Sequence, residues 1–208
     1  MGNNAAVDEQ VTCIVGYAEK PATPAWLLRM VALKTRIERL VHARFTHCSV
    51  STDMGVLKCP PSEGEALVNT LAARGDTEVY DMEFCRFADG FPDNSYKMIQ
   101  VARIRHKAIN GFYATIYVNA PVSSFGRDNE KEDSIARVYG DMGSILDLEY
   151  GFATERLIGQ SPSSYFVDEA KGRGYSAIDK INTRVWQRGH RELGHRVRAV
   201  YECNVFGP

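Results

Sequence analysis

A histidine in a strand-like segment is the first residue of this chain whose type and surroundings suggest chemistry. His47 lies within residues 45–51, where the alternation of side chains predicts a β-strand, and Ser49 and Ser51 would share its face. An imidazole can accept a proton from a thiol or from water at neutral pH. His47 is therefore a candidate general base. The alternative is a half-buried histidine that hydrogen-bonds to a serine or to a backbone carbonyl.

The elements expected around His47 follow a familiar order. A strand and an amphipathic helix precede it, and two further strands follow before residue 87. With the Thr-His-Cys-Ser-Val strand around His47, residues 11–87 resemble the first half of circularly permuted papain-like hydrolases of the NlpC/P60 class. The resemblance implies an amide or ester hydrolase in which His47 is the base and a polar residue on a neighbouring strand orients it.

The same resemblance implies a catalytic cysteine in the second half of the chain, at the start of a helix whose dipole lowers the pKa of the thiol. Cys203 is the cysteine in that half, and it lies five residues from the end with no helix to follow. Two interpretations stay open. Either Cys203 is the nucleophile in an unusual setting, or the fold persists without the chemistry.

His47 and Ser49 also match one half of the pattern of two-histidine phosphoesterases, which hold a phosphate with two His-x-Ser/Thr strands. None of the other four histidines has Ser or Thr two residues later. A phosphoesterase is therefore the weaker hypothesis for this strand.

A basic segment near the C-terminus is the second candidate site. Its arginines are Arg184, Arg188, Arg191, Arg196 and Arg198. Such a cluster can bind phosphate, nucleic acid or an acidic partner. The acidic residues within 128–133 are a candidate counterpart on a neighbouring subunit, which predicts head-to-tail self-association. A solvated or internally paired surface is the alternative.

Residues 24–43 give the strongest helix pattern in the chain. Thr23 and Pro24 are typical of a helix start. The apolar residues that repeat at spacings of three and four are Trp26, Met30, Leu33, Ile37 and Leu40. The basic outer face, which includes Arg36 and Arg39, is able to meet phosphate, and a solvated face is the alternative.

The whole pattern predicts an α+β fold, mainly an antiparallel sheet with helices packed on one side. The expected strands are at 11–17, 45–51, 56–59, 77–87, 111–118 and 196–206. The expected helices are at 24–43, 63–74, 96–108, 135–149 and 177–194. Residues 123–134 are expected to form an exposed loop, and residues 151–164 are only weakly patterned.

Size and composition fit one domain. A chain of 208 residues with 44% hydrophobic residues is long enough for one sizeable core. We expect a flexible N-terminus at 1–10 and a single domain at 11–208, with a sub-boundary near 121–134 as the alternative. The formal net charge of −1 does not mark the whole chain as a nucleic-acid binder or as an acidic tail.

Several classes of protein are disfavoured by what the sequence lacks. It contains no phosphate-binding glycine loop, no dinucleotide fingerprint and no Cys-x-x-Cys pair, so we expect no cofactor and no metal site. The five irregularly spaced cysteines favour a reducing compartment, such as the cytoplasm or a virion interior. No apolar run approaches the ~18–20 residues of a membrane span. The polar N-terminus lacks the features of a signal peptide, so secretion is not expected.

Three functional hypotheses follow. The first is a papain-like thiol hydrolase that uses His47 and Cys203, or a catalytically degenerate relative of one. The second is a non-enzymatic structural or assembly protein, such as a viral one, which contacts a protein partner or itself through charged segments. The third is a nucleic-acid-binding module that uses the basic segment at 184–198.

Overall fold

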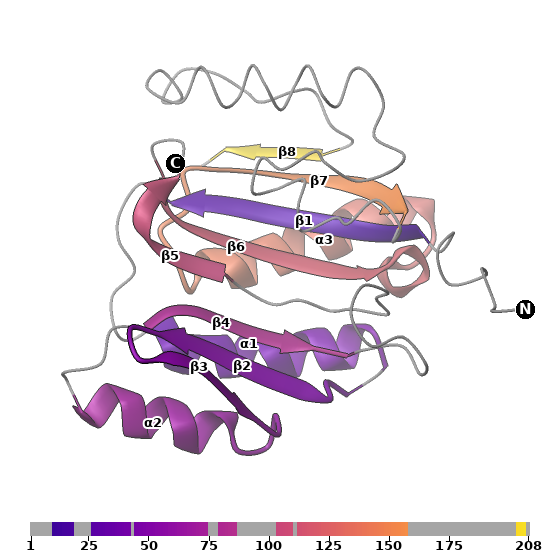
Figure 1. Ribbon diagram of the computed structural model, residues 1–208. Coiled ribbons are helices and arrows are strands. Elements are labelled where there is room, and N and C mark those ends of the chain that lie inside the picture. Colours follow the sequence, from indigo (N-terminus) through magenta and orange to yellow (C-terminus); the bar gives the residue numbers. More distant parts are fainter. Residues whose placement is uncertain are drawn as a thin grey trace, which may run out of the picture.

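The computed structural model describes residues 10–18, 26–42, 44–74, 79–86, 103–109, 112–157 and 203–206. In chain order they form β1 (Gln10–Ala18), α1 (Trp26–Leu40), β2 (His47–Thr52), β3 (Gly55–Cys59), α2 (Gly64–Arg74), β4 (Val79–Cys85), β5 (Arg103–Ile109), β6 (Phe112–Pro121), η2 (Val122–Phe125), α3 (Asp128–Gly143), β7 (Tyr150–Leu157) and β8 (Cys203–Phe206). Figure 1 shows a larger sheet above a smaller one, with α1 and α3 behind them. Every pairing between described strands is antiparallel, which confirms the predicted α+β class. None of the described helices is long and apolar enough to cross a membrane.

The larger sheet has the strand order β5-β6-β1-β7-β8, with β1 at its centre. Ile14 of β1 lies opposite Val118 of β6 on one side and opposite Ala153 of β7 on the other. All of residues 11–18 are buried. A strand that is buried on both faces reads as a nearly continuous apolar run, which explains the dense Val, Cys, Ile and Tyr content of β1.

The smaller sheet has the strand order β3-β2-β4, with β2 at its centre. Cys48 and Val50 point into the core and are almost completely buried. The alternate residues Ser49 and Ser51 are half-buried, and His47 is exposed. The alternation therefore confirms that the histidine and the two serines share a face.

The apolar face of α1 joins both sheets in one core. Its buried residues, none more than 4% exposed, are Trp26, Met30, Leu33 and Ile37. They belong to the same cluster as Ile14 and Val118 of the larger sheet and Val50 and Met82 of the smaller sheet. Because full burial of each such side chain contributes about 1.5–3 kcal/mol, this face is what fixes the helix against the sheets. The helix predicted at 24–43 is confirmed over Trp26–Leu40.

A strand stands where the sequence predicted the end of a helix. Residues 103–109 form β5, which pairs with β6 and places Ile109 opposite Phe112. The helix predicted at 96–108 is therefore wrong over 103–108, and residues 96–102 lie outside the described part. The overlooked signal is the Asn-Gly dipeptide between the two strands, which is typical of two-residue hairpin turns.

A helix begins earlier in the second half than the sequence predicted. α3 is Asp128–Gly143, so the exposed loop predicted at 123–134 is wrong over 128–134, whereas the helix predicted at 135–149 is confirmed over 135–143. The acidic run within 128–133 occupies the first turns of α3, where negative charge interacts favourably with the helix dipole. The weakly patterned stretch that follows contains β7, whose Phe152 is fully buried.

Candidate anion-binding site

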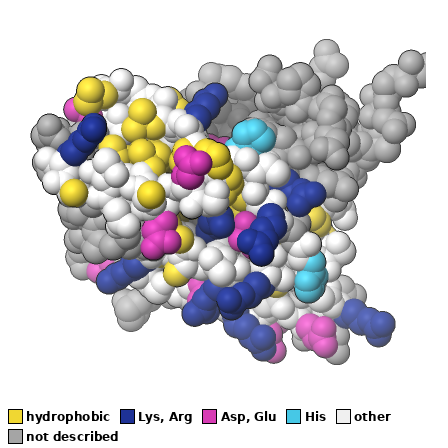
Figure 2. All heavy atoms as spheres, turned by 90° about the horizontal axis from the view of Figure 1, so that it is seen from below, with side chains coloured by type: hydrophobic (Ala, Val, Ile, Leu, Met, Phe, Trp, Pro, Cys, Tyr) yellow, Lys and Arg dark blue, Asp and Glu magenta, His cyan; other side chains and the backbone are white. Residues whose placement is uncertain are grey.

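A hollow of about 520 Å³ opens where the end of α1, the start of β2 and the end of β4 meet. Its described lining residues are Thr35, Glu38, Arg39, His42, Arg44 and Arg86. We name this feature the basic hollow. Figure 2 shows the lower face of the molecule, which carries many Lys and Arg side chains and histidines, with Asp and Glu side chains among them.

The turn after α1 positions the arginines of the basic hollow. His42 has a φ of 50°, the left-handed conformation that ends many helices. The chain then turns back toward β2, so Arg44 lies near Arg39 of the last helical turn. Arg86 follows β4, and the antiparallel pairing of β4 with β2 brings it to the same end of the sheet. Three cationic side chains from three segments therefore line one opening.

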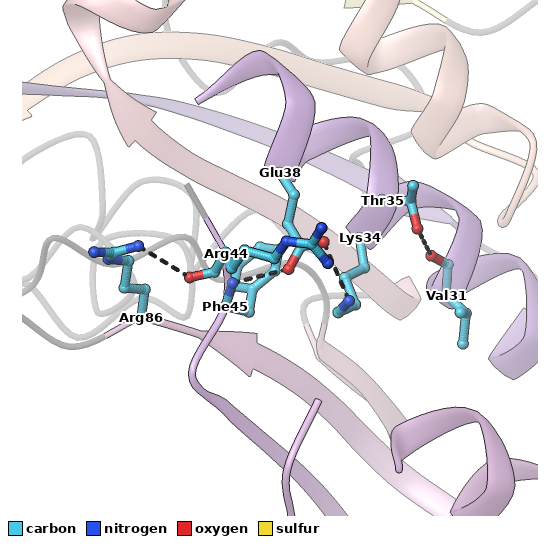
Figure 3. A network of polar contacts seen from close by, with 7 residues as sticks. All are labelled: Val31, Lys34, Thr35, Glu38, Arg44, Phe45 and Arg86. Atoms are coloured by element: carbon cyan, nitrogen blue, oxygen red, sulfur yellow. Dashed lines mark hydrogen bonds and ion pairs between the residues drawn. The ribbon is translucent and has the colours of Figure 1, made fainter. Parts of the chain in front are cut away.

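The acidic residue of the lining, Glu38, is already engaged. Its Oε2 accepts a hydrogen bond from Lys34 Nζ at 3.2 Å, and its Oε1 accepts one from the Phe45 backbone N–H at 2.9 Å (Figure 3). The Glu38 and Lys34 side chains are only 11% and 13% exposed. Lys34 therefore balances the negative charge of Glu38 beneath the surface. The positive charges of the arginines that line the hollow are not neutralised by Glu38.

Other basic residues of α1 contact α3 at the surface of the protein. Arg29 Nη1 donates to the Ser144 carbonyl at 2.7 Å, and Arg36 pairs with Asp141. These contacts hold α1 against α3. Arg29 and Arg36 are therefore less available to bind phosphate on the basic face that the sequence predicted for α1. Within the described part of the chain, Arg39 has no carboxylate partner of this kind.

Arg86 is held in place by the backbone. Its Nη1 donates to the Arg44 carbonyl at 3.3 Å (Figure 3), and its remaining N–H groups keep their capacity to donate. Arginine presents a planar fork of donors that matches the oxygens of carboxylate and phosphate groups. The arrangement is thus able to hold an anion at this end of α1.

His47 lies just outside the basic hollow, on the exposed face of β2. Its Nδ1 lies 2.7 Å from Thr46 Oγ1, and the residue directly opposite it on β4 is Cys85. Burial, with the neighbouring Glu83 carboxylate as the next cause, raises the pKa of the Cys85 thiol to about 12. A protonated, 4%-exposed thiol is a poor nucleophile at neutral pH.

Cys203, the predicted nucleophile, is not brought to His47. It belongs to β8, at the edge of the larger sheet, whereas β4 of the smaller sheet contacts β5 at the opposite edge. Strands lie about 4.8 Å apart, so the four steps from β5 to β8 alone span on the order of 20 Å. Figure 1 places β8 and β2 at opposite ends of the molecule. The two residues therefore do not form a catalytic pair.

The basic segment at 184–198, with Arg184, Arg188, Arg191, Arg196 and Arg198, lies outside the described residues. The sequence pointed to Arg39 as part of a basic helix face, but it missed Arg44, His42 and Arg86. The first two lie in a turn whose shape depends on the left-handed His42. The third reaches the hollow only through the pairing of β2 with β4, which sequence spacing does not reveal.

Comparison with known proteins adds little to this geometry. No model of a protein family matches the chain, and no curated protein sequence matches it. Among solved structures, the Pseudomonas aeruginosa T6SS protein PA0821 superposes with a TM-score of 0.46 at 12% sequence identity. The match covers 77% of this chain and 45% of that protein, so the chain spans less than half of its length. A similarity at this level carries no conclusion about function.

Proposed function

We propose that this protein binds a ligand that carries two or more phosphate groups, and that the basic hollow is the binding site. The observation that carries the proposal is the convergence of Arg39, Arg44 and Arg86 on one opening whose acidic residue, Glu38, is already paired with Lys34. Guanidinium groups are well suited to phosphate because they bind its oxygens bidentately.

The number of donors favours more than one phosphate. Each guanidinium carries five N–H donors, so the three arginines together can serve the oxygens of more than one phosphate group at once. The hollow also has the size of a small-molecule site, since its volume of about 520 Å³ lies within the range of about 300–1,000 Å³ that is typical of such pockets. Polyphosphates, nucleoside triphosphates and the nucleic-acid backbone share this chemistry.

Titration calorimetry with pyrophosphate, a nucleoside triphosphate and a short single-stranded oligonucleotide tests the proposal and separates these sources. We expect at least one of the three to bind at low salt, and Arg39→Gln, Arg44→Gln and Arg86→Gln each to weaken it by about tenfold, the loss of one charged hydrogen-bonding group. The matched control is Arg137→Gln, which removes the same charge from an exposed site on α3. Equal affinities for the control and the three variants would overturn the assignment.

The thiol-hydrolase hypothesis stays a prediction, but the positions of His47 and Cys203 give it no support. Reactivity of a cysteine toward an electrophile, compared between wild type and His47→Ala, tests it independently of the basic hollow.

Self-association is a second candidate, favoured by the apolar surface of β3. Met54, in the turn before β3, is 80% exposed, Val56 and Leu57 of β3 are 59% and 40% exposed, and β3 is an edge strand of the described smaller sheet. An exposed apolar edge strand is a template for pairing with another strand. We propose a second copy of this chain as the partner. Sedimentation velocity over a range of concentrations should show association that Val56→Lys removes and Asn69→Lys, on exposed α2 surface, does not. A strict monomer would exclude it.

A further inference from the structure

Two cysteines face each other across the hairpin of the smaller sheet. Cys48 of β2 lies directly opposite Cys59 of β3, and both are free thiols. Opposite residues of an antiparallel pair have Cα atoms about 4.5–5.5 Å apart, which lies within the range of about 4.4–6.8 Å that a disulfide spans. After burial, the neighbouring Cys59 is the next cause that raises the pKa of the Cys48 thiol, as expected for two sulfurs that lie close together. The pair can therefore close without a rearrangement of the backbone.

The two thiols differ in their access to solvent. Cys48 is 1% exposed and packs in the core, where its Sγ lies 3.3 Å from the position that a Cβ on Gly64 would occupy. Cys59 is only partly buried, at the end of β3. Burial raises the pKa of the Cys48 thiol, with the neighbouring Cys59 as the next cause. An external reagent thus reaches Cys59 first, and Cys48 is placed to resolve the product.

We propose that Cys48 and Cys59 form a redox site that closes reversibly into a disulfide when the chain meets a small disulfide oxidant such as glutathione disulfide. The Cys59 thiol loses its proton and attacks the oxidant, forming a mixed disulfide and releasing one glutathione thiolate, which takes up a proton. Cys48 then loses its proton and attacks the Cys59 sulfur, releasing the second glutathione in the same way. The protein loses two electrons, and one glutathione disulfide becomes two glutathione thiols.

The geometry makes this pairing selective among the described cysteines. Cys85 lies opposite His47, on the other face of β2 from Cys48. Cys13 belongs to β1 of the larger sheet. Cys59 therefore has Cys48 as its nearest described thiol partner, and closure joins β3 covalently to β2.

The joining has a structural consequence. β3 is an edge strand that pairs only with β2 among the described strands, and its chain continues through Pro60 and Pro61 into α2. A disulfide between Cys48 and Cys59 prevents β3 from separating locally from β2. Hydrogen exchange of the β3 amides should therefore slow on oxidation, because local opening is what exposes such amides to solvent.

The test incubates the reduced full-length chain with glutathione buffers of increasing oxidising strength, followed by acid quench, alkylation and peptide mapping. We expect a peptide pair joined through Cys48 and Cys59, formed reversibly, together with slower hydrogen exchange in β3. Cys59→Ser and Cys48→Ser should each lose this product, and Cys85→Ser should keep it. A mixed disulfide that persists at Cys59, or a disulfide with a different cysteine, would overturn the proposal. Mapping of the wild-type chain alone decides this even where a variant fails to fold.

Discussion

Replacing Glu38 by Gln separates the role of this carboxylate in stability from its effect on the charge of the basic hollow. The amide of Gln keeps one carbonyl oxygen, so the Phe45 N–H retains an acceptor, but Lys34 loses its ionic partner in a site where both side chains are nearly buried. Hydrogen bonds to charged groups contribute about 1.5–3 kcal/mol, against about 1 kcal/mol for neutral ones. We therefore expect Glu38→Gln to lower the free energy of unfolding by about 1–2 kcal/mol.

The same substitution should strengthen anion binding. One unit of negative charge about 6 Å from a bound phosphate costs about 0.7 kcal/mol in water, so its removal should tighten binding by about threefold at low salt. Urea unfolding measures the first effect and titration with pyrophosphate the second. Glu132→Gln, at an exposed position on α3, is the matched control. A variant of unchanged stability, or one that binds pyrophosphate more weakly, would refute this reasoning about Glu38.

Further predictions concern the two sheets. Gly151→Ala should destabilise the fold by about 1–3 kcal/mol in thermal unfolding, because a Cβ there would lie 2.1 Å from the Tyr139 ring and 2.6 Å from the Val15 carbonyl oxygen. Gly140→Ala, in open space on α3, should instead stabilise it by about 0.5–1 kcal/mol, and the opposite order of the two variants would contradict the packing described. Because the pKa of the Cys85 thiol is raised from 9.0 to about 12 in the folded state, its contribution to stability is complete below about pH 9 and is lost as the pH rises toward about 12. In urea unfolding, the free energy of unfolding should fall less steeply with rising alkaline pH for Cys85→Ala than for wild type. Equal slopes of this free energy against pH would count against the Cys85 thiol as the cause.

The elements whose own residues carry a clear period were predictable from the sequence. Met30, Leu33 and Ile37 recur at helical spacing and are buried in α1, and the alternation around His47 matches β2. In both cases one face packs against the core. Burial of that face requires apolar residues at the spacing of the element, and this spacing is visible in the sequence.

The elements that were predicted incorrectly are those whose structure depends on pairing with another strand or whose residues are mostly charged. β5 gains its pairing from β6, and no periodicity of its own distinguishes it from a helix. The first turns of α3 are so polar that they read as a loop, although Ile135 and Met142 further along are buried. β7 contains Gly151, which weakens the strand signal, but the small residue is required where Tyr139 packs closely against the sheet.

The candidate site was harder to predict than the fold. Its arginines come from the end of α1, from the turn before β2 and from the end of β4, and only the pairing of β2 with β4 brings Arg86 to Arg44. The sequence favoured His47 because its neighbours look catalytic. It could not indicate that Cys203 belongs to the far edge of the other sheet.

The most direct test of phosphate binding is the salt dependence of affinity for a short single-stranded oligonucleotide, compared between wild type and the triple variant Arg39→Gln, Arg44→Gln and Arg86→Gln. Each neutralised phosphate of a single strand contributes about −0.7 to the slope of log K against log salt concentration. We predict that the triple variant binds far more weakly and that its slope is smaller in magnitude by about 2, while Arg137→Gln keeps the wild-type slope. A triple variant with the affinity and slope of wild type, or a wild type that binds none of this strand, pyrophosphate and a nucleoside triphosphate at low salt, would contradict the assignment of the basic hollow.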